Sequence, residues 1–192
     1  LMNLQQPLHK IIVEVLLRVR RNDGSLAPLY TFIPAAEENG TIGIIDRWVF
    51  ITTLNWMQSH QNQLDKIEHI NVNISGHSLN DEQFVHDLFV ILDRYTPLLP
   101  KLCVEITEGV ALDDLRGSRD LMQRLKAKGV KIALDDFGAG YTSFSYLCEL
   151  PAQSIKIDGS LIKDMMASTN NTAIVRTIVE LAKNLGMQCV AE

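Results

Sequence analysis

The sequence predicts an α/β protein with a parallel sheet, of the (β/α)₈ TIM-like barrel type. Short runs of branched apolar residues alternate with longer amphipathic segments, a pattern typical of repeated βα units. Polar residues also fall in or at the end of six successive predicted strands. A barrel draws functional side chains from many strand ends, whereas an open doubly wound sheet gathers its ligands mainly at one switch point, so the six positions favour the barrel. They are Glu14, Asn73, Glu105, Asp135, Lys156 and Glu192.

The first half of the chain predicts two strands and three helices. The strands are runs of branched apolar residues, at 11–19 and 67–73. The helices follow amphipathic patterns, at 31–39, 42–60 and about 81–95. Pro34 suits a first helical turn, and Asn80 is a plausible N-cap for the third helix.

The second half repeats the alternation more regularly. We expect strands at 102–107, 130–135, 154–157 and 187–191. We expect helices at 113–128, 142–149, 159–166 and 172–185. Gly129 and Gly186 follow two of these helices, where glycine commonly ends a helix.

Composition excludes several functional classes. The formal net charge is −5, and the only basic cluster is Arg18-Val19-Arg20-Arg21, whereas a general DNA or RNA binder needs a basic surface. No apolar run is long enough to cross a membrane. The three cysteines, Cys103, Cys148 and Cys189, are far apart, which indicates core residues in a reducing cytoplasm and not a disulfide framework.

Two adjacent carboxylates end the strand at 130–135. Asp135 and Asp136 follow an apolar run and precede a loop containing Gly138 and Gly140. Vicinal acids that lose hydration repel each other, so they need a neutralising partner, and Mg²⁺ prefers carboxylate oxygens. The alternative is a turn in which one carboxylate caps backbone N–H groups. The pair by itself leaves both interpretations open.

Side-chain alternation places the polar strand ends on one face. Asp135 shares its face with Ala133, while Ile132 and Leu134 take the opposite face. The same alternation holds for Asn73 and for Glu105, each of which is flanked by bulky apolar residues suited to packing against helices.

Seven short segments carry a family resemblance. In order, they are Glu14-Val15-Leu16-Leu17-Arg18, Phe32-Ile33-Pro34-Ala35-Ala36-Glu37, Val72-Asn73-Ile74-Ser75, Val104-Glu105-Ile106-Thr107-Glu108, Asp135-Asp136-Phe137-Gly138, Lys156-Ile157-Asp158 and Val190-Ala191-Glu192. This series resembles the EAL domain, a cyclic di-GMP phosphodiesterase family of bacterial signalling proteins. The resemblance covers nearly the whole chain and implies a modified barrel whose first strand runs antiparallel.

The resemblance implies a metal-dependent hydrolase that opens cyclic di-GMP to linear pGpG with two Mg²⁺ or Mn²⁺ ions. The first metal would be held by Glu14, Asn73, Glu105 and Asp135. Asp135 would bridge to a second metal that Asp136 also holds, with Glu192 as a ligand or the general base. Oxygen donors of this kind suit hard cations, and two metals suit phosphodiester hydrolysis.

Other positions match the family's substrate contacts and loop. Lys156 resembles the lysine that contacts the nucleophilic water, and Arg18 resembles a phosphate contact. Leu16 and Asp158 are carried over as further substrate-binding residues. Glu108 resembles the glutamate that positions the loop containing Phe137 and Gly138.

Simpler explanations exist for some of these residues. Lys156 could pair with Asp158 on the same strand face, and Arg18 could be a solvated charge at the rim. Asn73 could be a hydrogen-bonded barrel residue. Glu14, within an apolar strand, favours a ligand role, because an unpaired carboxylate there would be costly.

The chain departs from the family pattern at several points. Val15, Val19 and Ala139 stand where the family usually has Ala, Trp and Thr. Gln6-Pro7-Leu8 also lies closer to Glu14 than the family's corresponding segment does. We therefore expect one EAL-type domain over 1–192, shortened at its N-terminus and lacking the last βα unit after Glu192.

The resemblance also implies partners and location. Cyclic di-GMP is the expected ligand, a homodimer and a flanking GGDEF or sensory domain are possible, and the setting is the bacterial cytoplasm. No DNA, RNA or membrane contact is expected from this segment. Two alternatives stay open: a catalytically inactive cyclic di-GMP receptor, and an unrelated barrel hydrolase with paired carboxylates, such as a glycosidase.

Overall fold

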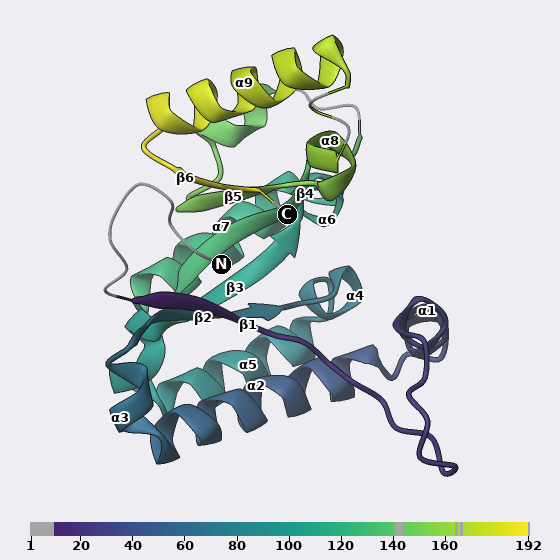
Figure 1. Ribbon diagram of the computed structural model, residues 1–192. Coiled ribbons are helices and arrows are strands. Elements are labelled where there is room, and N and C mark those ends of the chain that lie inside the picture. The colour runs from purple at the N-terminus through teal and green to yellow at the C-terminus, as the bar shows by residue number, and fades with distance from the viewer. Residues whose placement is uncertain (1–9, 141–143, 164, 166, 192) are drawn as a thin grey trace. The chain divides into compact units, whose positions relative to one another are not determined.

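The computed structural model describes residues 10–140, 144–163, 165 and 167–191 (Figure 1). The predicted site residue Glu192 and the segment Gln6-Pro7-Leu8 lie outside these residues. The chain forms two compact units, Met2–Leu102 and Cys103–Glu192, and each is described by itself.

The unit Met2–Leu102 contains a parallel pair of strands. β1 (Ile11–Val15) pairs with β2 (Ile67–Asn73), with Glu14 opposite Asn71 and Val15 opposite Val72. The expected antiparallel first strand is therefore wrong for the described strands. The resemblance had supplied that expectation, while the alternation of strands and helices itself favours parallel pairing.

Helices cover this pair and supply its core. They are α1 (Leu29–Glu38), α2 (Ile42–Ser59), α3 (Gln61–Leu64), α4 (Gly76–Leu79) and α5 (Glu82–Asp93), followed by the 3₁₀ helix η1 (Thr96–Lys101). α2 and α5 lie side by side, and α2 also contacts β2 (Figure 1). Their inward residues, among them Phe50, Leu54 and Leu92, are fully buried, and this burial is the main stabilising contribution.

Several boundaries in this unit differ from the prediction. The helix expected at 31–39 begins at Leu29, so Pro34 lies inside α1 and not in its first turn. The strand expected at 11–19 ends at Val15, and Arg20 instead forms an antiparallel bridge with Leu26 around a turn in which Gly24 has a φ of +85°. The N-cap of α5 is Asp81, not Asn80, because the Asp81 carboxylate accepts hydrogen bonds from Gln83 N and Phe84 N. A carboxylate also interacts favourably with the positive end of the helix dipole.

The unit Cys103–Glu192 contains four parallel strands in chain order. They are β3 (Leu102–Thr107), β4 (Lys131–Phe137), β5 (Ser154–Ile157) and β6 (Gln188–Ala191). The helical segments are α6 (Glu108–Asp113), α7 (Leu115–Ala127), η2 (Phe144–Cys148), α8 (Gly159–Lys163) and α9 (Thr169–Asn184). α7 packs on β4, and α9 lies over β5 and β6 (Figure 1). The parallel α/β organisation is confirmed, while the expected TIM-like barrel that lacks its last βα unit stays a prediction.

Helix ends in this unit follow local chemistry. Gly129 and Gly186 have φ values of +88° and +71°, as their predicted role after a helix requires. The helix expected at 113–128 starts at Leu115, because the Asp114 carboxylate accepts a hydrogen bond from Gly117 N and caps α7. The segment expected as a helix at 142–149 contains η2; residues 141–143 lie outside the described part.

An irregularity in β4 falls on the two adjacent aspartates. Leu134 is opposite Ile155 and Phe137 is opposite Ile157, so β4 holds one more residue than β5 between these pairs. Asp136, within the irregularity, has a φ of +53°. Such a bulge re-aims side chains near the end of a strand.

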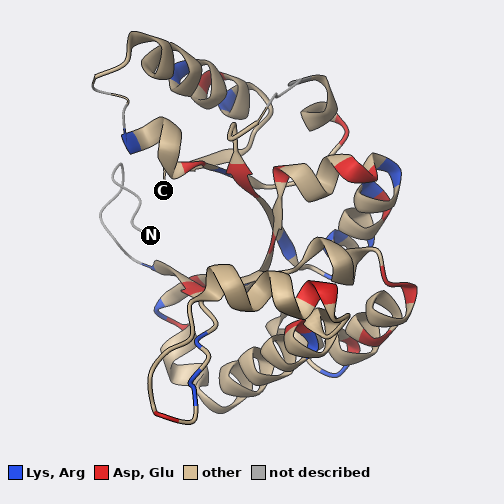
Figure 2. Cartoon of the chain, turned by 90° about the vertical axis from the view of Figure 1, so that its right-hand side faces the viewer, with Lys and Arg blue, Asp and Glu red and all other residues tan. Residues whose placement is uncertain are grey.

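Charge is distributed over helices of both units. Figure 2 shows basic and acidic residues interspersed on the helical surfaces. The helix α9, for example, carries charges of both signs, from Arg176, Glu180 and Lys183. Among the described residues, none of the helices has the length and apolar content needed to cross a membrane.

Candidate functional site

Three charged side chains meet inside the unit Cys103–Glu192. Lys156 Nζ lies 3.0 Å from Glu105 Oε1 and donates a hydrogen bond of 3.1 Å to Asp135 Oδ2. The exposed fractions are only 1% for Glu105, 8% for Asp135 and 1% for Lys156. Buried charges are tolerated only when paired, so these three residues depend on one another.

The strand register brings the three residues together. β3, β4 and β5 are parallel neighbours. Thr107, the last residue of β3, lies opposite Asp135 of β4, so the carboxyl ends of the two strands are adjacent. Lys156 lies between the paired residues Ile155 and Ile157, opposite the bulge that contains the two aspartates. Two carboxylates and one ammonium leave a net charge of −1 in a buried place, which favours a further cation.

Asp136 extends this group toward solvent. Its backbone N donates a 3.0 Å hydrogen bond to Asp135 Oδ1, and its side chain is exposed. Partial burial and the neighbouring Asp135 and Asp158 carboxylates raise the pKa of Asp136, which Lys156 partly offsets. An ionised Asp136 therefore gains from a nearby positive charge.

The turn after Asp136 is attached to a buried carboxylate. Glu108, at the start of α6 and 6% exposed, accepts a 2.8 Å hydrogen bond from Gly138 N through Oε2. Its Oε1 accepts a hydrogen bond from the hydroxyl of Tyr146. Phe137, which lies between Asp136 and Gly138 in the chain, is fully buried. This contact fits the predicted loop-positioning role of Glu108. Tyr146 could not be singled out from the sequence, because a tyrosine in an apolar segment is typical of an ordinary core residue.

Two predicted ligands meet in the unit Met2–Leu102. Asn73 Nδ2, at the end of β2, donates a 3.1 Å hydrogen bond to Glu14 Oε1 of β1. Asn73 is exposed and Glu14 is half-buried. Leu16 and Arg18 follow β1, both exposed, and Arg18 Nη1 donates to Leu17 O at 2.7 Å.

A second buried carboxylate holds the chain just after Asn73. Asp46 of α2 accepts hydrogen bonds from Ser75 N at 3.0 Å and from Ser78 Oγ at 2.7 Å. Ser75 in turn caps α4 by accepting from Ser78 N. Asp46 was also missed; its signal is a charged residue on the otherwise apolar, buried face of a helix.

The remaining predicted residue that the structure describes lies after β5. Asp158 N donates a 3.1 Å hydrogen bond to Phe137 O, which ties the end of β5 to the loop after β4. The Asp158 carboxylate accepts hydrogen bonds from Ser160 N at 2.8 Å and from the Ser160 hydroxyl, at the start of α8. Lys156 is paired with Glu105 and Asp135.

The donor chemistry of the candidate residues fits a hard divalent cation. The predicted ligands supply carboxylate and amide oxygens and no histidine or thiolate, as Mg²⁺ and Mn²⁺ prefer. Within the described residues, however, no group of three or more His, Cys, Asp or Glu side chains is gathered as a complete metal site. The predicted ligands come from two units, and Glu192 lies outside the described residues.

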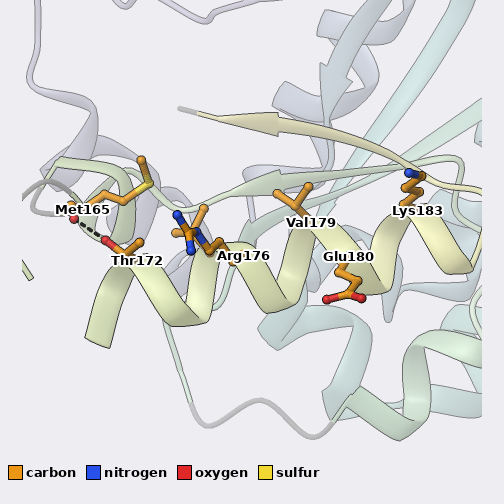
Figure 3. A pocket seen from close by; sticks show the side chains of 7 residues that line it. Met165, Thr172, Arg176, Val179, Glu180 and Lys183 are labelled. Carbon is orange, nitrogen blue, oxygen red and sulfur yellow. Dashed lines mark hydrogen bonds between the residues drawn. The ribbon is translucent and has the colours of Figure 1, made fainter. Parts of the chain in front are cut away.

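A shallow pocket along α9 lies apart from these residues in the sequence. Its lining combines apolar, hydroxyl and charged residues of α9 with Met165, whose backbone O accepts a 2.6 Å hydrogen bond from Thr172 Oγ1 (Figure 3). The lining residues are Met165, Thr172, Val175, Arg176, Val179, Glu180 and Lys183. None of them is a candidate site residue.

Comparison with known families decides the classification. The model of the EAL domain matches residues 8–192. The chain belongs to the EAL domain family. The resemblance inferred from seven short segments is therefore confirmed, and the parallel strands and helices described above are those of an EAL domain.

Individual relatives agree with this assignment. This EAL domain is 34% identical over 182 residues to the cyclic di-GMP phosphodiesterase PdeB of Shewanella oneidensis, covering 94% of the chain and 21% of PdeB. The structure of the PaMucR phosphodiesterase in a c-di-GMP complex is similar, with a TM-score of 0.81, 32% identity and coverage of 93% of this chain and 72% of that one.

A second solved structure carries a different description. The EAL domain of FimX from Pseudomonas aeruginosa, bound to c-di-GMP, has a TM-score of 0.84 and 28% identity, and the match covers 97% of this chain and 74% of that one. The fold is thus shared with domains described as a phosphodiesterase and as a c-di-GMP-bound domain.

Proposed function

We propose that this EAL domain is a phosphodiesterase that hydrolyses cyclic di-GMP to linear pGpG in the bacterial cytoplasm. The observation that carries the proposal is the buried group of Glu105, Asp135 and Lys156, whose burial is costly and is not needed for an apolar core. The names of PdeB and PaMucR as phosphodiesterases support the same reaction and substrate.

We assign divalent metal binding to the carboxylates named above. The proposed ligands are Glu14, Asn73, Glu105, Asp135 and Asp136, with Glu192 as a further ligand or the general base. When bound, Mg²⁺ or Mn²⁺ would neutralise phosphate charge and lower the pKa of water.

Side chains of the chain itself would bind the nucleotide and stabilise negative charge. Lys156 is held by two carboxylates within 3.1 Å, so its ammonium is fixed in position and can stabilise a developing negative charge without reorganisation. The exposed Arg18 is suited to a phosphate oxygen, because its guanidinium donates several hydrogen bonds in one plane. Leu16 and Asp158 are proposed as further contacts with the nucleotide.

Hydrolysis can be measured directly. The purified protein carrying this chain is incubated with cyclic di-GMP and Mn²⁺ or Mg²⁺, with or without EDTA, and pGpG is separated by chromatography. We expect turnover that EDTA abolishes. Glu105→Gln is expected to lower kcat by at least about 100-fold, the scale of losing one positioned electrostatic group. Glu38→Gln, on the exposed face of α1, is the matched control and retains activity. Absence of pGpG with either metal would refute the proposal.

Binding without hydrolysis is the second candidate function. FimX supports it, since its EAL domain is described only as bound to c-di-GMP, and so does Ala139, which replaces the family's usual Thr beside Gly138. Calorimetry showing tight cyclic di-GMP binding, together with no pGpG after prolonged incubation with Mn²⁺, would select this function.

The larger assembly is also part of the proposal. The chain spans 21% of the length of PdeB, so sensory or GGDEF domains of the whole protein are proposed partners. We propose a homodimer formed through the EAL domain, which light scattering of the purified protein would test.

A further inference from the structure

A buried tyrosine outside the set of predicted site residues contacts the carboxylate that holds the turn after β4. Tyr146 lies in η2, is only 5% exposed, and donates its hydroxyl hydrogen to Glu108 Oε1. Burial, followed by the hydrogen bond to the Glu108 carboxylate, raises the pKa of Tyr146 far above its usual range. The hydroxyl therefore remains a donor, and Glu108 has a fixed partner on one oxygen.

The other oxygen of Glu108 holds the turn after β4. Glu108 Oε2 accepts from Gly138 N at 2.8 Å. Gly138 has a φ of +90°, and a Cβ there would lie 2.7 Å from Leu161 Cδ1 and 3.3 Å from Ile178 Cδ1. The turn is therefore confined by the apolar side chains of α8 and α9 on one side and anchored by a carboxylate through its N–H.

The anchored turn contains an unfavourable backbone conformation. Asp136 has a φ of +53°, the one positive value for a non-glycine residue that the described part of the chain contains. Such a conformation is unfavourable for a residue that carries a Cβ and persists only when the surroundings hold it. Gly138 is two residues away and Asp135, which contacts Lys156, is adjacent, so the anchor at Gly138 acts on both aspartates.

We propose that Tyr146 is a positioning residue for the metal site: its hydroxyl holds the Glu108 carboxylate on Gly138 N and thereby sets the orientation of Asp135 and Asp136. This inference rests on the proposed metal-dependent function. Tyr146 acts through Glu108 and the backbone and touches none of the reacting groups.

Removing one oxygen atom tests the role with little change in packing. Tyr146→Phe keeps the ring in the core but leaves Glu108 Oε1 without this donor, which favours another side-chain rotamer and weakens the bond to Gly138 N. Tyr95→Phe is the matched control. The Tyr95 hydroxyl also donates to a side chain, Asn55 Oδ1 at 2.7 Å, but in the other unit.

Three measurements are made on the protein carrying this chain. Hydrogen exchange and the chemical shift of the Gly138 amide report the anchor directly. A Mn²⁺ titration reports metal affinity, and kcat at saturating Mn²⁺ reports the assembled site.

In Tyr146→Phe we expect Gly138 exchange at least about tenfold faster and Mn²⁺ affinity about 10–100-fold lower, the scale of losing an outer-shell partner. We expect kcat at saturating Mn²⁺ to return to within about threefold of wild type, because the ligands themselves remain. Tyr95→Phe should change none of these.

A second variant separates positioning from general destabilisation. Glu108→Ala removes both acceptor oxygens, so the Tyr146 hydroxyl has no carboxylate left to position, and adding Tyr146→Phe to it should cause no further loss of Mn²⁺ affinity. It also serves if Tyr146→Phe fails to fold, since Glu108→Ala alone must then release the Gly138 amide. Unchanged Gly138 exchange and Mn²⁺ affinity in Tyr146→Phe would overturn the inference, as would additive losses in the double variant. Wild-type protein that binds Mn²⁺ but makes no pGpG would refute the hydrolase and leave the positioning test intact.

Discussion

The two groups of candidate site residues are held in different ways. The buried set, Glu105, Asp135 and Lys156, lies within a strand layer and is stabilised by mutual charge pairing. The rim pair, Glu14 and Asn73, shares one hydrogen bond of 3.1 Å and contacts solvent. The same class of ligand is thus expected to contribute very differently to folding in the two units.

The physical reason is desolvation. A carboxylate that loses its water must gain an opposite charge or several hydrogen bonds, so the buried set links site chemistry to stability. An exposed pair keeps water as an alternative partner and is worth little to folding. In the metal-free protein, substitutions in the buried set should therefore change the free energy of unfolding more than substitutions in the rim pair.

Lys156→Met should have the largest effect. It leaves the buried carboxylates of Glu105 and Asp135 facing each other without the ammonium, and removal of one member of a buried pair costs about 3–5 kcal/mol. Urea unfolding followed by circular dichroism measures the loss. Lys183→Met, exposed on α9, is the control and should stay within about 0.5 kcal/mol. If Lys156→Met and Lys183→Met lower the free energy of unfolding by the same small amount, charge pairing does not stabilise the buried set.

Asp46→Ala should have an intermediate effect. Ser75 N and Ser78 Oγ each lose an acceptor, and a buried unsatisfied group costs about 1–3 kcal/mol. Asp46→Asn keeps one acceptor oxygen and should lose less. Asp65→Ala, an exposed position, is the control. If Asp46→Ala unfolds at the wild-type urea concentration, then Asp46 does not hold the end of β2.

Glu14→Gln should hardly change stability while weakening metal binding. The Gln carbonyl can still accept from Asn73 Nδ2, so the free energy of unfolding should remain within about 0.5 kcal/mol. Mn²⁺ affinity should fall, because a neutral amide replaces a carboxylate. Urea unfolding and a Mn²⁺ titration on the same sample separate the two outcomes. A stability loss comparable to that of Lys156→Met would erase the distinction between the rim pair and the buried set.

Asp136→Asn should raise stability slightly. Burial, Asp135 and Asp158 raise the folded-state pKa of Asp136 above its ordinary value of 3.8, so the ionised side chain destabilises the folded state at pH values above that raised pKa. This destabilisation decreases as the pH falls through the folded-state pKa of Asp136, and it is absent below pH 3.8, where the carboxyl is protonated in both states. Asn removes the charge and tolerates the φ of +53°, so a gain below about 1 kcal/mol, limited by solvent screening, is expected at neutral pH and none below 3.8.

The control for Asp136→Asn is Asp136→Ala. Ala also removes the charge, but its Cβ makes the left-handed conformation unfavourable by roughly 1–2 kcal/mol. Thermal unfolding at several pH values compares the two variants. Asn and Ala variants of equal stability would show that the backbone conformation at Asp136 carries no strain.

Much of the fold could be predicted from local patterns. The strand at 67–73 and the one at 102–107 have the predicted bounds, and Gly129 and Gly186 end helices as expected. These features depend on periodicity and on the conformational freedom of glycine, both of which are local. The antiparallel first strand was wrong, because strand direction is set by pairing between distant segments.

The candidate site was predictable as residue types but not as contacts. Glu105, Asp135 and Lys156 were singled out by their place at strand ends. Their mutual pairing depends on the one-residue bulge in β4, which places Lys156 opposite both aspartates. Tyr146 and Asp46 were missed for the same reason: each hydrogen-bonds a residue 29 or more positions away.

The sequence by itself determined the family, the α/β class and the oxygen-donor chemistry of the site, because motif order, periodicity and residue type are local properties of the chain. Tertiary structure decided which carboxylate is neutralised by Lys156, which turn Glu108 anchors and which acids remain exposed. Burial and pairing arise only when strands and helices distant in the sequence pack together, and the free energy of a charged group depends on that packing.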